Sequence, residues 1–253
     1  MTDSPGKAEL RDLIWDRLVD AAAVRPPGAH GHIPNHGDAR AAAARLAAHP
    51  WFREARTLKC NPDTPHQWVR EAALQAGKTV YMAVPRLTTP DPFLRIEGSM
   101  LDPDSAARAA TRAGAHRYGI PVTVAEVSHI DMVVVGCVGV TPTGDRLGKG
   151  AGYADIEWGL LTATGAIDDT TRTATTVHAL QLVAAIPTEP HDFGLDLIAL
   201  ADRVIETGRT GPRPRGIGAD LAPVQRQSIP ALRAWGAAAP PGPLAPPEDA
   251  TPS

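Results

Sequence analysis

The sequence predicts an α/β protein with a mainly parallel sheet. Runs rich in β-branched residues alternate with helix-like segments along most of the chain, and this alternation is typical of βαβ units. The most apolar run, residues 132–140, is continuous rather than alternating, as in a central strand that is buried on both faces. A hydrophobic content of 43% in 253 residues is sufficient to fill the core of such a fold.

The first third of the chain supplies the first helices and strands. Leu10, Ile14 and Leu18 recur at helical spacing and predict an amphipathic helix over residues 7–23, which Pro26 and Pro27 stop. A glycine- and histidine-rich loop follows. The next expected elements are, in order, an alanine-rich helix near 38–48, a strand at 56–60, a helix near 65–76 and a strand at 79–84.

The rest of the chain continues the alternation. Asp104 or Ser105 is expected to cap a helix that ends at Gly114. The expected elements that follow are the central strand at 132–140, a helix from about 153, strand-like runs near 174–185 and 195–200, and a basic stretch at 203–215. Residues 1–236 are interpreted as one domain. Residues 237–253, rich in proline and alanine, are interpreted as a disordered tail.

Composition and charge exclude several classes of function. The 25 basic and 28 acidic residues give a net charge of -3, so no overall positive field is available to hold a nucleic-acid backbone. No run approaches the roughly 20 apolar residues of a membrane helix, and the N-terminus lacks the apolar stretch of a signal peptide. We therefore expect a cytoplasmic protein that binds neither nucleic acid nor membrane, with Cys60 and Cys137 as reduced thiols in the core.

A glycine-rich, cationic loop lies between the central strand and the helix at 153. Within the segment TPTGDRLGKGAGYADIEWG, four glycines precede the helix, Gly144, Gly148, Gly150 and Gly152, and the cations Arg146 and Lys149 lie among them. Glycines allow backbone N–H groups to form a concave anion nest, and the helix that follows adds the positive end of its dipole. The loop is not a Walker A loop, which needs Ser or Thr after its Lys, and it is not a dinucleotide fingerprint, since Tyr153 stands where the third glycine would be. Local composition therefore fits a phosphate-binding loop and a solvated surface turn equally well.

Two cations share the apolar face of the first helix. On a helical wheel, Lys7 and Arg11 fall in the sector of Leu10, Ile14 and Leu18. Charged groups that face the body of a protein need an anionic partner, because burying an unpaired charge is costly. The alternative is that both side chains bend back to solvent at the first turn of the helix.

Three motifs occur in order along the chain: the K-x-x-x-R of Lys7 and Arg11, the segment RLGKGAGYAD at 146–155, and the H-D-x-x-x-D of residues 191–196. In this order they resemble the 5-formyltetrahydrofolate cyclo-ligase family over about residues 7–208. Segments such as IPNHGDA, KCNPDTP and EPHDFGLDLI are similar to a divergent branch of that family, the methenyltetrahydrofolate synthetase domain-containing proteins.

The resemblance implies a three-layer α/β/α sandwich with a mainly parallel sheet, similar to the ribose-5-phosphate isomerase and CoA-transferase group. It implies an enzyme that uses ATP and Mg²⁺ to cyclise 5-formyltetrahydrofolate to 5,10-methenyltetrahydrofolate through phosphorylation of the formyl oxygen. The phosphate-binding residues that it implies are Lys7, Arg11, Arg146, Lys149 and the backbone of Gly148, Gly150, Gly152 and Tyr153. Among these, Lys149, Arg146 and Tyr153 are the catalytic candidates, and Asp155 and Asp192 are the implied Mg²⁺ ligands.

Two regions depart from the family pattern and leave the substrate open. Lys149, Ala151 and Ala154 replace residues that are usually Tyr, Gly and Tyr and that also meet the pterin. After the first strand, where the family offers a Glu, this chain has only Asp63, which could instead cap the next helix. A non-folate small molecule, or a non-catalytic descendant that binds nucleotide, is therefore an alternative to a reduced folate.

Other polar clusters are assigned no catalytic role. His30, His32 and His36 lack the regular paired spacing of a zinc site in a loop, so we interpret them as part of a shaped loop. The sequence SHID at 128–131 suggests a hydrolase triad, but the chain has no G-x-S-x-G elbow. Trp158 is interpreted as a core residue, with a place in the nucleotide or substrate pocket as the alternative.

Overall fold

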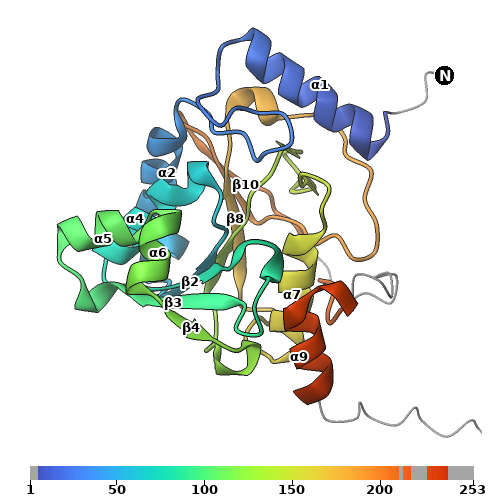
Figure 1. The fold of residues 1–253 in the computed structure, drawn as a ribbon. Coiled ribbons are helices and arrows are strands. Elements are labelled where there is room, and N and C mark those ends of the chain that lie inside the picture. Colours follow the sequence, from blue (N-terminus) through green and yellow to red (C-terminus); the bar gives the residue numbers. More distant parts are fainter. Residues whose placement is uncertain (1–4, 211–212, 218–226, 239–253) are drawn as a thin grey trace, which may run out of the picture.

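A mixed eight-stranded sheet forms the centre of the computed structural model, which describes residues 5–210, 213–217 and 227–238 (Figure 1). Its strands are, in chain order, β1 (Thr57–Cys60), β2 (Thr79–Ala83), β3 (Phe93–Glu97), β4 (Ile120–Val122), β5 (Met132–Val134), β8 (Arg172–Thr176), β9 (Leu197–Ala199) and β10 (Val204–Glu206). They lie in the order β10-β9-β8-β5-β1-β2-β3-β4. Two further short strands, β6 (Gly139–Val140) and β7 (Arg146–Leu147), pair with each other.

The five inner strands of the sheet are parallel. They run from β9 through β8, β5 and β1 to β2. Strand β5 is central, and Met132 in it is opposite both Leu58 of β1 and Arg172 of β8. The antiparallel strands lie at the edges, with β10 on one side and β3 and β4 on the other. The predicted mainly parallel sheet is therefore confirmed.

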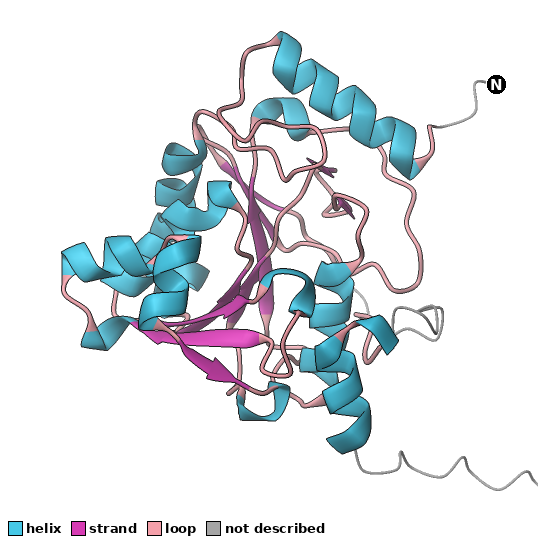
Figure 2. Ribbon diagram, in the orientation of Figure 1, coloured by secondary structure: helices cyan, strands magenta, loops and turns pink. Residues whose placement is uncertain are grey.

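Helices cover both faces of this sheet, which confirms the three-layer architecture (Figure 2). The α-helices are α1 (Lys7–Asp20), α2 (Ala39–Ala48), α3 (Pro50–Glu54), α4 (Gln67–Gln75), α5 (Pro103–Ala109), α6 (Arg112–Tyr118), α7 (Tyr153–Ala163) and α9 (Pro230–Ala238). Short 3-10 helices lie at Thr64–His66, Pro85–Leu87, Gly98–Met100, Val124–Glu126 and Ala179–Gln181. Helices α2, α4, α5 and α6 lie on one face, and α7 and α9 lie on the other (Figure 1).

The core consists of one apolar cluster on each face of the sheet and a third beneath α1. In β5, Met132 and Val134 belong to the cluster that includes α2 and α4, whereas Val133 belongs to the cluster that includes α7. All three are buried, so the prediction of a strand covered on both faces is confirmed. Helix α1 packs its Ile14 against residues such as Leu147, beyond the carboxyl ends of the parallel strands. It thereby covers the loops that follow these strands.

The helix expected to begin at Asp104 or Ser105 is two short helices, and both predicted boundaries were wrong. Asp102 is the N-cap of α5, where its Oδ1 accepts a hydrogen bond from the backbone N–H of Ser105 at 2.8 Å. Gly114 lies inside α6 rather than ending α5. A Cβ at Gly114 would lie 1.8 Å from the carbonyl oxygen of Arg108, so glycine is needed for the close approach of the two helices.

Several strand boundaries also differ from the prediction. Strand β5 stops at Val134, and the chain then leaves the sheet and forms the β6–β7 hairpin, in which the N–H of Val138 donates to the carbonyl oxygen of Leu147 at 2.7 Å. The strand-like run expected at 174–185 ends earlier, with β8 at Thr176. Strand β3 and the edge strand β4 were not predicted, and β4 contains a proline, which a strand tolerates at a sheet edge.

The C-terminal part of the described chain is helical. Helix α9 runs to Ala238, so it includes residues 237 and 238 of the predicted tail. The remainder of that tail, 239–253, lies outside the described residues. Within the described ranges, no helix is long and apolar enough to cross a lipid bilayer.

Candidate active site

The glycine-rich loop connects β7 to the start of α7 and packs against α1. Gly150 has φ +101° and Gly152, the N-cap residue of α7, has φ 70°, a region that side chains with a Cβ rarely adopt. A Cβ built on Gly150 would lie 3.3 Å from Cζ of Arg11. The two glycines therefore have a conformational role, and Gly150 also allows the loop to approach the guanidinium of α1 closely.

Lys7 and Arg11 lie on the inner face of α1, as the helical wheel predicts. The Nε of Arg11 donates to the carbonyl oxygen of Gly148 at 2.7 Å. The Nζ of Lys7 lies 2.7 Å from Oδ2 of Asp192 and 2.9 Å from Oε2 of Glu189. The segment that carries the H-D-x-x-x-D motif thus supplies anionic partners for Lys7, whereas the hydrogen bond of Arg11 goes to a backbone carbonyl.

Burial and pairing act in opposite directions on the pKa values of this ion pair. Burial lowers the pKa of Lys7, but hydrogen bonds and charge attraction from Asp192 and Glu189 outweigh it, and the net direction is upward. Burial raises the pKa of Asp192, but hydrogen bonds from Lys7 and from the backbone N–H of Glu189 outweigh it, and the net direction is downward. Both groups are therefore charged at neutral pH.

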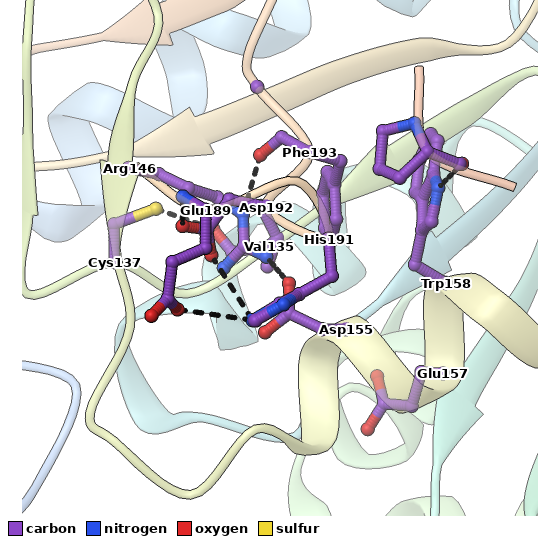
Figure 3. A network of polar contacts seen from close by, with 12 residues as sticks. Val135, Cys137, Arg146, Asp155, Glu157, Trp158, Glu189, His191, Asp192 and Phe193 are labelled. Atoms are coloured by element: carbon purple, nitrogen blue, oxygen red, sulfur yellow. Dashed lines mark hydrogen bonds and ion pairs between the residues drawn. The ribbon is translucent and has the colours of Figure 1, made fainter. Parts of the chain in front are cut away.

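Arg146 is the most deeply buried cation of the loop, with 5% of its surface exposed. Its Nε donates to the carbonyl oxygen of Phe193 at 3.0 Å, and its Nη2 forms an ion pair with Oδ1 of Asp155 (Figure 3). Its Cζ lies 3.8 Å from the centre of the Phe193 ring. The guanidinium is thus fixed between the motif at 191–196 and the first turn of α7.

The two predicted metal ligands have different surroundings. Asp192 lies with Glu189 and His191 in a group whose donor atoms are all within 4.8 Å of one another, and these residues lie side by side in Figure 3. Asp155 makes its ion pair with Arg146 instead. Carboxylate oxygens are the ligands that Mg²⁺ prefers, so the carboxylates of Asp192 and Glu189 fit the implied metal, whereas Asp155 lies outside this group.

Lys149 points away from these carboxylates, toward the loop after β1. Its Nζ lies 3.2 Å from Oδ1 of Asp63, and 41% of its side chain is exposed. Asp63 occupies the N-cap position of the 3-10 helix that begins at Thr64, but its side chain makes no capping hydrogen bond there. A Cβ built on Gly136 would lie 2.8 Å from Oδ2 of Asp63, so this carboxylate also packs closely against the chain after β5. The alternative of a simple helix cap is therefore not supported.

Tyr153 begins α7, and its half-buried side chain packs against the apolar cluster on the α7 face of the sheet. Arg146, Lys149 and Tyr153 thus flank the glycine loop on different sides. Their assignment as catalytic candidates stays a prediction.

A buried ion pair beneath the loop was not predicted. Lys59 of β1 pairs with Glu157 of α7, and Lys59 also donates to Oδ1 of Asn61 at 3.2 Å. The side chains of Lys59 and Glu157 are only 2% and 5% exposed. Strand alternation contains a signal for this pair, because it places Lys59 on the opposite face from Leu58, toward α7.

The polar clusters that were assigned no catalytic role stay apart from the candidate site. Among the described residues, the group that could hold a metal is the one at 189–192, not the three histidines of the loop, of which His30 pairs with Asp16 and His36 with Asp38. His129 lies at the amino ends of the strands, 3.6 Å from Asp131.

The interpretations of the core residues are also confirmed. Trp158 is buried and stacks on Phe193, so it is a core residue, and it also lines a small internal cavity together with Lys59 and Phe193. Cys60 and Cys137 are buried and free. Burial raises the pKa of the Cys137 thiol to about 11, so it is protonated and unreactive at neutral pH.

Comparisons with known proteins identify the family and support the fold. The family model of the 5-formyltetrahydrofolate cyclo-ligase family matches residues 3–201. A methenyltetrahydrofolate synthase domain-containing protein from Mus musculus is 36% identical over 220 residues, which cover 83% of this chain and 58% of that protein. The protein of the same description from Homo sapiens is 34% identical over 220 residues, with 83% of this chain and 56% of that protein covered. The chain thus spans a little over half the length of the curated relatives that it matches.

A solved structure supports the fold. The structure of 5,10-methenyltetrahydrofolate synthetase from Aquifex aeolicus superposes with a TM-score of 0.50 at 15% identity and covers 82% of this chain and 96% of that one. At this identity the likeness concerns the fold. Together with the motifs at Lys7, Arg146 and Asp192 and the family match over most of its length, these findings show that the chain belongs to the 5-formyltetrahydrofolate cyclo-ligase family.

Proposed function

We propose that the chain is an ATP- and Mg²⁺-dependent ligase that cyclises 5-formyltetrahydrofolate to 5,10-methenyltetrahydrofolate. The observation that carries the proposal is the meeting of three segments that are far apart in sequence. Lys7 and Arg11 come from α1, Arg146 comes from β7 directly before the glycine loop, and Asp192 comes from the motif after β8. At a glycine-rich loop and a helix N-terminus, cations can bind the phosphates of a nucleoside triphosphate, and carboxylates can bind its metal ion.

Each of these residues has a distinct part in the proposal. Lys7, Arg11 and Arg146 hold phosphate oxygens, and the backbone of residues 148–153 cradles them. Asp192, which lies beside Glu189 and His191, and Asp155 would hold Mg²⁺, since carboxylate oxygens suit that ion. Since Lys7 and Arg146 are already paired with these carboxylates, the site is electrically balanced before ligands bind. Positioning and charge neutralisation are what phosphoryl transfer requires of a protein.

When bound, ATP supplies the phosphoryl group and Mg²⁺ offsets its negative charge. In the proposed reaction the formyl oxygen attacks the γ-phosphorus, and the bond between the γ-phosphorus and the β–γ bridging oxygen breaks. N10 then attacks the formyl carbon. Phosphate leaves with the former formyl oxygen, and N10 loses its proton. The protein holds the phosphates so that the transferred group lies in line between the oxygen that it leaves and the oxygen that it joins.

One observation favours a second candidate, an ATP-dependent ligase for a non-folate small molecule. Lys149, which stands where the family usually has a Tyr that meets the pterin, forms an ion pair with Asp63. This pair makes the wall of the proposed substrate site charged rather than aromatic. A substrate with its own charged or strongly polar group would match such a wall better than a flat heterocycle does.

Turnover with defined substrates tests the proposal. The protein is incubated with ATP, Mg²⁺ and 5-formyltetrahydrofolate, and methenyl absorbance is followed together with ADP release. We expect both signals, and we expect Arg146→Ala to abolish them. Binding of ATP without any folate-dependent product would support the second candidate, and the absence of ATP binding would refute both.

A further inference from the structure

Phe193 is buried beside the proposed phosphate site without being positioned to touch a ligand. We infer that Phe193 is a positioning residue that fixes the guanidinium plane of Arg146 for phosphate binding, an inference that rests on the proposed function. Only 2% of Phe193 is exposed, and both faces of its ring are covered. The ring therefore acts through its neighbours.

The two faces of this ring have different partners. On one side, Cζ of Arg146 lies 3.8 Å from the ring centre. On the other, the ring of Trp158 stacks at 4.2 Å with an interplanar angle of 14° (Figure 3). A guanidinium lying on an aromatic face is held by cation–π attraction and dispersion, and this attraction is stronger where water is excluded, as it is around the buried Arg146.

The stack continues beyond Trp158 and is anchored there. The Nε1 of Trp158 donates to the carbonyl oxygen of Pro214 at 2.8 Å, and Cζ of Arg213 lies 5.9 Å from the Trp158 ring centre. Arg213 in turn pairs with Asp196 at 2.6 Å. Trp158 is therefore held in place by these contacts, and it restricts the Phe193 ring that stacks on it. The Phe193 ring in turn restricts the guanidinium of Arg146 on its other face.

The stack leaves one edge of the guanidinium directed at the glycine loop. Nε of Arg146 is used by the carbonyl oxygen of Phe193, and Nη2 is used by Asp155. The third nitrogen, Nη1, borders Gly148, where a Cβ would lie 3.7 Å from it. Arg146 therefore presents Nη1 to the loop in one fixed orientation. Without the Phe193 ring the guanidinium of Arg146 could rotate. Binding of an anion would then have to immobilise it, which costs free energy and lowers the affinity.

Calorimetric titration of the whole protein with ATP and Mg²⁺, without folate, tests this inference. We expect Phe193→Leu to weaken ATP binding about tenfold, which corresponds to ~1.4 kcal/mol. Phe193→Tyr keeps the aromatic face and should bind like the wild type. The matched control is Phe52→Leu, which removes an equally buried ring that lies beneath Lys78, with Nζ 5.3 Å from its centre, in the other core cluster.

A second background separates positioning from general loss of structure. In Arg146→Ala, the further change Phe193→Leu should leave ATP affinity unchanged, because the ring then has no guanidinium to hold. An equal loss in both backgrounds, or the same loss in Phe52→Leu, would overturn the inference. Wild-type protein that binds no ATP would refute the proposed function itself, whereas intact wild-type binding with an unaffected Phe193→Leu would refute this inference alone.

A measurement on the wild type needs no variant to fold. The side-chain protons of Arg146 lie over the Phe193 ring, so we expect their NMR resonances to be shifted upfield by its ring current. Resonances at the positions of a free arginine would contradict the stack.

Discussion

The ion pair between α1 and the motif at 191–196 gives the sharpest prediction about stability. Replacing Lys7 with Met should destabilise the protein at pH 7, because Asp192 then loses a hydrogen-bonded cation in a partly buried position. The Nζ of Lys7 lies 2.7 Å from Oδ2 of Asp192, and the side-chain exposures are 23% for Lys7 and 14% for Asp192. Glu189, the second partner of Lys7, is 56% exposed, so solvent weakens the contribution of this ion pair to stability.

The magnitude follows from the kind of contact. A hydrogen bond to a charged group contributes about 1.5–3 kcal/mol. Since Asp192 keeps the backbone N–H of Glu189 as a donor, we expect a loss of about 1–2 kcal/mol for Lys7→Met. In a chain of this size that corresponds to a fall in Tm of about 2–8 °C.

The pH dependence identifies the pair as the cause. The pKa of Asp192 is lowered in the folded protein, so its contribution to stability is present above the unfolded value of about 3.9 and is lost as the pH falls through the folded value. The pKa of Lys7 is raised, so its contribution is present below about 10.4 and is lost as the pH rises through the folded value. The difference between wild type and Lys7→Met should therefore be largest between these limits.

Thermal unfolding of wild type and variant at several pH values is the assay. The control is Arg203→Met, which removes an exposed ion pair with Asp202 and should change Tm little. A difference for Lys7→Met that is the same at about pH 3 as at pH 7, or no larger than that of the control, would refute the reasoning.

Three further predictions concern the loop and the residues around it. Lys59→Met leaves Glu157 buried without its cation and should cost about 3–5 kcal/mol in chemical denaturation, a result that a loss below about 1 kcal/mol would contradict. Gly150→Ala imposes a side chain at φ +101° and should weaken ATP binding in calorimetry more than it lowers Tm; unchanged affinity would argue against the loop as the phosphate site. Asp155→Asn should raise the Mg²⁺ concentration needed for turnover, whereas the exposed Asp202→Asn should not, and equal Mg²⁺ requirements would remove Asp155 from the metal site.

The parallel centre of the fold could be predicted because its signals are local. The continuous apolar run beginning at Met132 and the β-branched run beginning at Thr79 are each visible in a short window of sequence. The exact end of β5 was not visible, because the chain leaves the sheet where Gly136 meets Asp63, a contact between residues far apart in sequence. The division between α5 and α6 at Gly114 likewise depends on a close approach to Arg108 that no periodicity shows.

Those features of the candidate site that follow from a periodic sequence pattern could be predicted. The inward direction of Lys7 and Arg11 followed from helix periodicity, and the contacts of both residues agree with it. The pairing of Arg146 with Asp155 and of Lys149 with Asp63 did not follow, because opposite charges attract wherever tertiary packing brings them together. The role of Phe193 was equally hidden, since an aromatic residue in a sequence shows no sign of which groups will cover its faces.

In the proposed function this site couples ATP cleavage to ring closure, and the stoichiometry of the two products reports on that coupling. Purified protein is given ATP, Mg²⁺ and a limiting amount of 5-formyltetrahydrofolate, and ADP and 5,10-methenyltetrahydrofolate are quantified in the same sample. We predict one ADP for each methenyl product, with neither formed by Arg146→Ala. Release of ADP that is independent of the folate, or methenyl formation without ADP, would contradict the account.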